Sequence, residues 1–221
     1  VLNGLSLEES SSKLLAIIAN TRGAQEACNF QQIHYLGFPL SVSEEFQKRN
    51  TNQSILQALK NIEEIQDLSI KNNKELVVYL SMAFGNPYGE LYHTDIVSEL
   101  IEKLQKMNIS IISLSDTIGT SNCDNIASIF HSASYNYPKI EFGAHFHTTS
   151  HAWKEKIESA YENGCRRFDS ALKGYGGCPM ADNKLIGNMP TEKIVEHFKE
   201  QSNLKLVELE KSLQLTNSIF E

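Results

Sequence analysis

Two histidines stand two residues apart near the end of an apolar segment that reads Gly143-Ala-His145-Phe-His147. If this segment forms a strand, residues two apart point to the same face, so His145 and His147 project side by side. Neutral imidazole is a common ligand for Zn, Fe, Mn and related metals. The alternative is a pair of hydrogen-bonded core histidines. Placement at a strand end, in a chain that alternates strands and helices, favours a metal site.

A glycine-rich loop, Gly174–Pro179, follows the last strand-like run and continues to Gly187-Asn188. Three glycines in four positions allow backbone conformations that are closed to other residues. Such loops after late strands of a barrel often bind phosphate or cover the site. We expect Cys178 in this loop to be exposed, and a thiol there can act as acid, base or nucleophile. The alternative is a tight turn with an incidental thiol.

Two aspartates also lie beside or within strand-like runs: Asp116 follows one directly, and Asp169 lies inside the run Arg166–Leu172. Asp116, in the run Asp116-Thr117-Ile-Gly119, is expected at the rim, where its carboxylate could contact a metal-bound water or orient a ligand. An Asx-type turn or a helix cap explains the same Asp-Thr pair equally well. Asp169 is expected to be a buried partner of an imidazole N–H, as carboxylates beside metal ligands often are.

The elements that must position these residues alternate along the whole chain. Strand-like runs cover Leu14–Asn20, Ile33–Phe38, Leu76–Phe84, Ile109–Ser115, Lys139–His147 and Arg166–Leu172. Between them lie segments with apolar residues three and four apart, which predict helices. We also predict a helix that begins at Thr191 as its N-cap, and a terminal helix over Leu204 to Phe220.

Strands separated by helices predict a parallel sheet with right-handed crossovers. An open doubly wound sheet and a (β/α)8 barrel both fit, but no Gly-x-Gly-x-x-Gly follows a strand, which weakens the nucleotide-binding interpretation. A barrel needs eight strands and typically about 250 residues. Only six runs are visible, and the first comes almost at once in a chain that begins without Met, so we expect the first two strands to be missing.

The composition limits the possible partners. The net charge is −7, from 20 basic and 27 acidic residues, which argues against non-specific binding of nucleic acid. No apolar run approaches the roughly 18 residues that a membrane span needs, so no membrane association is expected. The four cysteines form no close-spaced pair, which argues against structural zinc and indicates a reducing, cytoplasmic setting.

Several motifs, taken in order, resemble the 3-hydroxy-3-methylglutaryl-CoA (HMG-CoA) lyase family. They span most of the chain, and the Gly-Gly-Cys-Pro loop is the most specific of them. The wider superfamily of metal-dependent Claisen-type synthases shares the His-x-His but usually not the cysteine loop. The matching segments are Ser43–Phe46 with Arg49-Asn50, Gly85–Tyr88, Ser113–Gly119, His145–His147, Gly176–Pro179 and Gly187–Glu192.

This resemblance implies a TIM (β/α)8 barrel that cleaves HMG-CoA, an acyl-CoA substrate, to acetyl-CoA and acetoacetate. It implies that His145, His147 and Asn188 hold a divalent metal, Mg²⁺ or Mn²⁺, with Zn²⁺ as a further possibility. The metal would acidify the substrate hydroxyl, and His145 is a candidate for the base that removes its proton. Cys178 would protonate the enolate of acetyl-CoA, and Asp116 is a third candidate for a catalytic residue.

The chain also departs from the family pattern. The family's first strand carries an Arg-Asp pair, whose Asp is a fourth metal ligand in the family, and its second strand carries a functional Glu. None of these has a counterpart here, and Thr148 stands where the family usually has Asp. The loop from Cys178 to Asn188 is one residue longer than usual. We therefore expect residues 1–221 to form a single (β/α) barrel domain that lacks two strands and has little or no lyase activity.

The two open sheet edges would present unpaired backbone N–H and C=O groups that can pair with another chain, so we also expect a homodimer. A related Claisen-type synthase or aldolase and a non-catalytic barrel that binds an acyl-CoA remain alternative functions.

Overall fold

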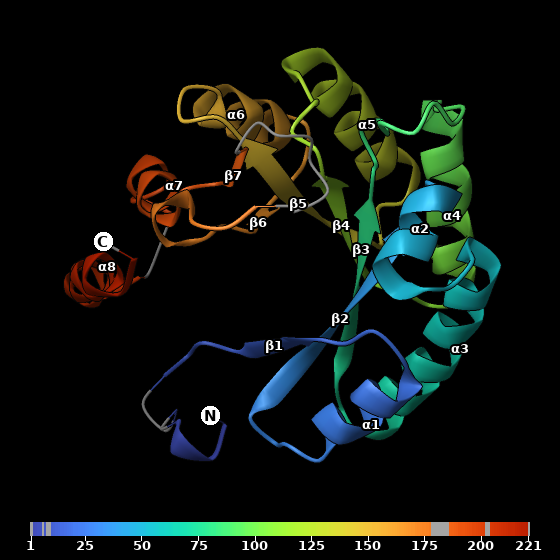
Figure 1. The fold of residues 1–221 in the computed structure, drawn as a ribbon, viewed down its shortest axis with the longest axis horizontal. Helices are drawn as coiled ribbons and strands as arrows, with labels where there is room; N and C mark the ends of the chain where they lie inside the picture. The colour runs from blue at the N-terminus through green and yellow to red at the C-terminus, as the bar shows by residue number, and fades with distance from the viewer. Residues whose placement is uncertain (1, 6, 8–9, 178–185, 202–203, 221) are drawn as a thin grey trace.

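The computed structural model describes residues 2–5, 7, 10–177, 186–201 and 204–220. Six strands form a parallel sheet in the order β1-β2-β3-β4-β5-β6, and β7 pairs antiparallel with β5 (Figure 1). The strands are β1 (Leu14–Ile17), β2 (Ile33–Ser41), β3 (Glu75–Ser81), β4 (Ile111–Asp116), β5 (Glu141–Thr148), β6 (Arg167–Phe168) and β7 (Gly187–Asn188).

The helices that connect successive parallel strands are α1 (Thr21–Cys28), α2 (Glu44–Thr51), α3 (Ile55–Lys71), α4 (Thr94–Lys106), α5 (Cys123–Asn136) and α6 (Trp153–Glu162). Two further helices, α7 (Thr191–His197) and α8 (Leu206–Phe220), follow β7. Short 3-10 turns are η1 (Leu2–Gly4), before β1, and η2 (Leu172–Gly174), between β6 and β7. No helix in the described part of the chain combines the length and apolar composition that crossing a membrane requires.

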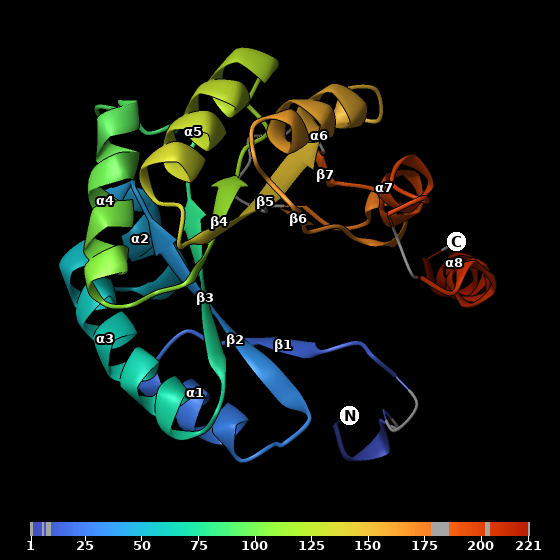
Figure 2. The same cartoon turned by 180° about the vertical axis from the view of Figure 1, so that it is seen from behind.

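The sheet curls rather than lying flat. Figures 1 and 2 show α3, α4, α5 and α6 along its convex side, and β1 and β6 apart from one another at its two ends. This is an arc of a (β/α)8 barrel with six parallel strands, as the sequence predicts. The carboxyl ends of the strands meet at one rim of the arc, which is where barrels of this kind hold their ligands.

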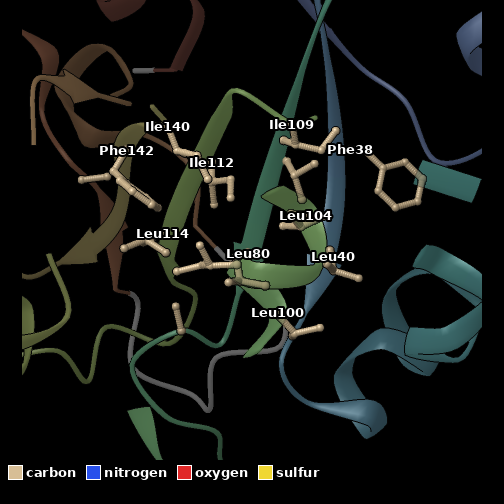
Figure 3. Packing of buried hydrophobic residues seen from close by; sticks show 14 of the residues in the cluster. Phe38, Leu40, Leu80, Leu100, Leu104, Ile109, Ile112, Leu114, Ile140 and Phe142 are labelled. Atoms are coloured by element: carbon tan, nitrogen blue, oxygen red, sulfur yellow. The ribbon is translucent and has the colours of Figure 1, made fainter. Parts of the chain in front are cut away.

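The main core lies between the sheet and these helices. Leu80 of β3 and Leu114 of β4 are register partners and are fully buried, as is Leu104 of α4 (Figure 3). Helix α4 turns Val97, Leu100, Ile101 and Leu104 toward the sheet, because residues three and four apart share a helix face. Burying each such side chain contributes about 1.5–3 kcal/mol relative to leaving it exposed.

The structure corrects several predicted boundaries. For example, β1 ends at Ile17 and not at Asn20, and β2 continues to Ser41 and not only to Phe38. The run predicted as a strand over Arg166–Leu172 pairs with β5 only at β6, forms an isolated bridge between Ala171 and Pro190, and then turns into η2. Thr191 is the first residue of α7 and not its cap, because Pro190 holds the N-cap position without a side-chain cap bond. The last helix begins at Leu206, two residues after the predicted start.

Candidate metal centre

The alternation of β5 separates its side chains between the core and the concave side of the sheet. Phe142, Ala144 and Phe146 are buried in the core cluster. His145 and His147, on the opposite face, line a cavity of about 740 Å³. Their ring centroids are 5.5 Å apart. The structure therefore brings the two predicted ligands together at the carboxyl end of one strand.

His147 is held by a backbone carbonyl of the neighbouring strand. Its Nδ1 lies 3.0 Å from the carbonyl oxygen of Asp116. A carbonyl oxygen can only accept, so Nδ1 carries the proton and Nε2 keeps its lone pair in the neutral ring. Burial lowers the pKa of His147 below its ordinary value, although the bond to the Asp116 carbonyl opposes this shift. The ring is thereby kept neutral, which is the form that binds metals.

His145 is held in the same way by a carboxylate. Its Nδ1 lies 3.0 Å from Oδ2 of Asp169, and the Ser113 hydroxyl approaches the same oxygen at 3.5 Å. The expected role of Asp169 as an imidazole partner is confirmed. The expected deep burial is wrong, because 27% of the Asp169 side chain is exposed. Both imidazoles thus use Nδ1 for support, which leaves both Nε2 atoms for a ligand.

The pairing of β7 with β5 places Asn188 beside the two histidines. The antiparallel pairing sets Asn188 directly opposite His147, and side chains of directly opposed residues lie on the same face of a sheet. Asn188 lines the same cavity as the histidines. Its Nδ2 donates to the carbonyl of Tyr175 at 2.8 Å, which fixes the orientation of the amide. The amide oxygen is then the atom available to bind a cation.

The glycines of the loop allow this placement of Asn188. Gly174, Gly176 and Gly177 all have positive φ, at 67°, 87° and 158°. A Cβ on Gly176 would lie 3.0 Å from Asn188 Nδ2, and one on Gly174 would lie 2.8 Å from the Asn188 carbonyl oxygen. The expected role of the glycines, to allow backbone conformations closed to other residues, is confirmed. Cys178 lies outside the described residues.

The side chain of Asp116 takes neither of its two predicted roles, although it does stabilise the backbone of the loop that follows β4. Its carboxylate accepts from the backbone N–H groups of Thr120 and Ser121, at 2.9 and 3.1 Å, four and five residues further on. An Asx-type turn would reach only two residues on, and the N-cap of α5 is Asn122. It also forms an ion pair with Lys156 at 2.8 Å and is 1% exposed. Asp116 is not among the residues that line the cavity, so the carboxylate does not reach the rim. The residue serves the site through its backbone carbonyl.

Comparisons with known proteins identify the family. A family model described as HMGL-like matches residues 10–219. The chain belongs to the HMGL-like family. The hydroxymethylglutaryl-CoA lyase of Bacillus subtilis is 32% identical over 215 residues, which are 93% of this chain and 68% of that protein.

Two solved structures extend this comparison. An HMG-CoA lyase from Acinetobacter baumannii, in complex with coenzyme A and 3-methylmalate, has a TM-score of 0.80 and 28% identity, over 90% of this chain and 64% of that one. The HMG-CoA lyase from Brucella melitensis, at 24% identity, supports the fold with a TM-score of 0.88, over 99% of this chain and 77% of that one. The chain thus spans roughly two thirds to three quarters of these relatives.

The donor atoms at this HMGL-like site suit a hard or borderline cation. Two neutral imidazole nitrogens and one amide oxygen form a mixed set, with room in the cavity for waters or substrate oxygens. Within the described ranges, no group of three or more His, Cys, Asp or Glu could hold a metal by itself. A metal here would therefore need the Asn188 amide as well as the histidines.

Three residues around the site were missed by sequence reasoning. Tyr79 and Arg167 line the cavity from β3 and β6. The Tyr79 ring meets His145 edge-on at 5.6 Å between centroids, and burial raises the pKa of its phenol. Lys156 lies behind His147, where its ammonium is 3.1 Å from the His147 carbonyl oxygen. Strand alternation could have pointed to Tyr79, which is two residues before a strand end.

Proposed function

We propose that this HMGL-like protein is a metal-dependent carbon–carbon lyase that cleaves HMG-CoA to acetyl-CoA and acetoacetate. The observation that carries the proposal is the convergence of His145, His147 and Asn188 on one cavity, with both Nδ1 atoms already bonded. The names of the relatives support the substrate, since they are HMG-CoA lyases and one is solved with coenzyme A.

In this proposal His145, His147 and Asn188 would hold Mg²⁺ or Mn²⁺. The metal, when bound, would polarise the tertiary hydroxyl of the substrate and lower its pKa. Asp169 keeps the Nδ1 proton on His145, so Nε2 is the basic atom of that ring. One lone pair serves either as a ligand or as a proton acceptor at a given moment, so the two proposed roles of His145 compete.

Metal binding and turnover of His145→Ala separate these two roles. If His145 is a ligand, the substitution lowers both Mn²⁺ affinity and turnover. If it is only the base, Mn²⁺ affinity stays at the wild-type value and turnover alone falls, by a factor of about 10² to 10⁴. Both the wild type and the variant are produced in the source cells and purified at the length that the native protein has there.

Cys178 is proposed as the acid that protonates the enolate of acetyl-CoA. Gly177, the residue before it in the sequence, lines the cavity, which supports this proposed role. In the native protein, Cys178→Ser is expected to reduce turnover by a factor of about 10² or more and to leave Mn²⁺ binding unchanged. Unchanged turnover would remove Cys178 from the reaction.

The reaction itself is tested by product analysis. The native protein is incubated with Mn²⁺ and HMG-CoA, and separately with acetyl-CoA and a 2-oxo acid. Acetoacetate from the first mixture supports the lyase. Condensation in the second mixture alone would support a related Claisen-type synthase, and absence of Mn²⁺ binding would favour a non-catalytic barrel that binds an acyl-CoA.

The 221-residue chain alone is proposed to turn HMG-CoA over little or not at all. Its described residues offer two imidazoles and one amide at the cavity, and the family's Arg-Asp pair has no counterpart among the 221 residues. In the family the Asp is a metal ligand and the Arg would stabilise the developing oxyanion. Without them, weaker metal binding and a slower chemical step are expected. Acetoacetate formation by this chain at a rate typical of the family would contradict this.

We further propose that the chain forms a homodimer. β1 and β6 are the end strands of the described sheet, and Ile17 at the end of β1 is 64% exposed. Unpaired strand edges with apolar side chains favour association. Light scattering on the purified chain should give twice the mass of 24.9 kDa. A monomeric mass across the micromolar range would contradict the proposal.

A cytoplasmic location completes the proposal. Cys28, Cys123 and Cys165 are free thiols in the described part of the chain, which fits a reducing compartment. Fractionation of the source cells, followed by detection with an antibody, tests this directly. Recovery of the protein from an organelle or from the medium would contradict it.

A further inference from the structure

A buried lysine lies directly behind the candidate metal centre. Lys156 of α6 is 4% exposed. Its Nζ lies 2.8 Å from Oδ2 of Asp116, 3.1 Å from the carbonyl oxygen of His147 and 3.3 Å from that of Gly119. A buried ammonium without such partners would be strongly unfavourable, so all three of its donors are used.

These contacts join the ends of two strands. Asp116 ends β4, and His147 lies one residue before the end of β5. Lys156 binds the side chain of Asp116 and the backbone of His147 at the same time. The backbone carbonyl of the same Asp116 accepts the hydrogen bond that His147 Nδ1–H donates. The lysine therefore fixes both ends of the hydrogen bond that orients the imidazole.

Asp116 is in turn held in place by groups other than the lysine. Its carboxylate accepts from the Ser121 hydroxyl at 2.5 Å and from two backbone N–H groups. The carboxylate and ammonium form an ion pair in which the two side chains are 1% and 5% exposed. In a site of low dielectric such a pair is held tightly, because neither charge has water as an alternative partner.

We infer that Lys156 is a positioning residue for the metal centre: with Asp116 it holds His147 as the Nδ1–H tautomer, with Nε2 directed into the cavity. This inference rests on the proposed function, in which Nε2 of His147 is a metal ligand. Lys156 touches neither substrate nor metal in this account. It acts through the backbone of His147 and through Asp116.

The test measures the imidazole tautomer without metal. Long-range ¹H–¹⁵N spectra of the ¹⁵N-histidine-labelled 221-residue chain report which ring nitrogen of His147 is protonated. Three variants are compared with the wild type: Lys156→Met, the neutral pair Lys156→Met/Asp116→Asn, and Lys154→Met. The double substitution removes both buried charges, so it keeps the test valid if the single one fails to fold.

Lys154→Met is the matched control. Lys154 lies on the same helix, but its side chain is 57% exposed and pairs only weakly, at 3.5 Å, with Glu158. Its replacement removes the same charge from α6 without touching β4 or β5. We expect this variant to keep the wild-type tautomer and the wild-type affinity for Mn²⁺.

The wild type is expected to show the Nδ1–H tautomer. The double variant is expected to populate the Nε2–H tautomer as well, and its dissociation constant for Mn²⁺ should rise at least tenfold, as for other groups that orient metal ligands. A folded double variant with the wild-type tautomer and affinity would overturn the inference, even if its melting temperature falls. Absence of Mn²⁺ binding by the native protein would instead contradict the proposed function, while the tautomer spectra would still decide the role of Lys156.

Discussion

Removal of the Asp169 carboxylate tests whether support of His145 matters for metal binding. The bond from His145 Nδ1 to Asp169 is 3.0 Å long, and hydrogen bonds to a charged group contribute about 1.5–3 kcal/mol. The two side chains are 35% and 27% exposed, so water can replace part of the bond. We therefore take about 1.4 kcal/mol, which is a tenfold loss of Mn²⁺ affinity in Asp169→Ala.

The Asp169→Asn variant refines this magnitude. An amide oxygen in the same place can still accept from Nδ1, but a bond to a neutral acceptor is about half as strong as one to a carboxylate. About 0.7 kcal/mol is then lost, which corresponds to a roughly threefold weaker affinity. If the Asp169 carboxylate orients the imidazole, Mn²⁺ affinity should therefore decrease in the order wild type, Asp169→Asn, Asp169→Ala.

Isothermal titration of the purified chain with Mn²⁺ measures all three affinities. Asp67→Ala, which removes an exposed carboxylate from α3, controls for the change in net charge. Wild-type affinity in Asp169→Ala would refute the reasoning, because the ring would then need no partner at Nδ1. An equal loss in the Asp67 control would refute it too, since the effect would be a matter of overall charge.

Three further predictions concern the surroundings of the site. Asn188→Ala should lower Mn²⁺ affinity at least tenfold in the same titration, and unchanged affinity would exclude its amide as a ligand. Gly119→Ala should lower the free energy of unfolding in urea by about 1–3 kcal/mol, because φ is +72° and the new Cβ would lie 2.7 Å from Ile186. Gly89→Ala is the control: its φ is +69°, but no atom lies within 4 Å of the new Cβ, so it adds only the backbone strain. Its free energy of unfolding should therefore fall less than that of Gly119→Ala. Burial raises the pKa of the Cys165 thiol from 9.0 to about 12. As the pH rises, the unfolded chain therefore loses this proton at a lower pH than the folded chain, which stabilises the unfolded state. The melting temperature should fall between pH 9 and pH 12. Cys165→Ala should flatten that decline, and an identical slope would contradict the assignment.

Local patterns in the sequence were sufficient for the histidine pair. The two-residue period of a strand places His145 and His147 on one face, and the structure shows both at the same cavity. The partnership of Asp169 with an imidazole was also predicted, from its position in the next strand-like run, Arg166–Leu172. These inferences need only the alternation of a strand and the neighbour relation of consecutive parallel strands.

Contacts between distant segments could not be foreseen in the same way. β7 is only two residues long, and its pairing with β5 is set by the fold of the loop rather than by a strand-like pattern. A single lysine on an amphipathic helix is ordinarily exposed, so Lys156 gave no signal for burial. Its partner Asp116 lies 40 residues earlier, and only the curl of the sheet brings α6 behind β4. Without that contact, the Asp-Thr pair is equally consistent with a turn and with a site at the rim.

The central claim is that His145 and His147 bind one divalent metal through Nε2. Pulsed electron paramagnetic resonance of the Mn²⁺-loaded chain measures this directly, because imidazole nitrogens bound to Mn²⁺ modulate the electron spin echo. We expect one bound Mn²⁺ per chain with two coupled nitrogens in the wild type, and one coupled nitrogen in each of His145→Ala and His147→Ala. A spectrum of hydrated Mn²⁺ without nitrogen coupling, or the same coupling in both variants, would contradict it.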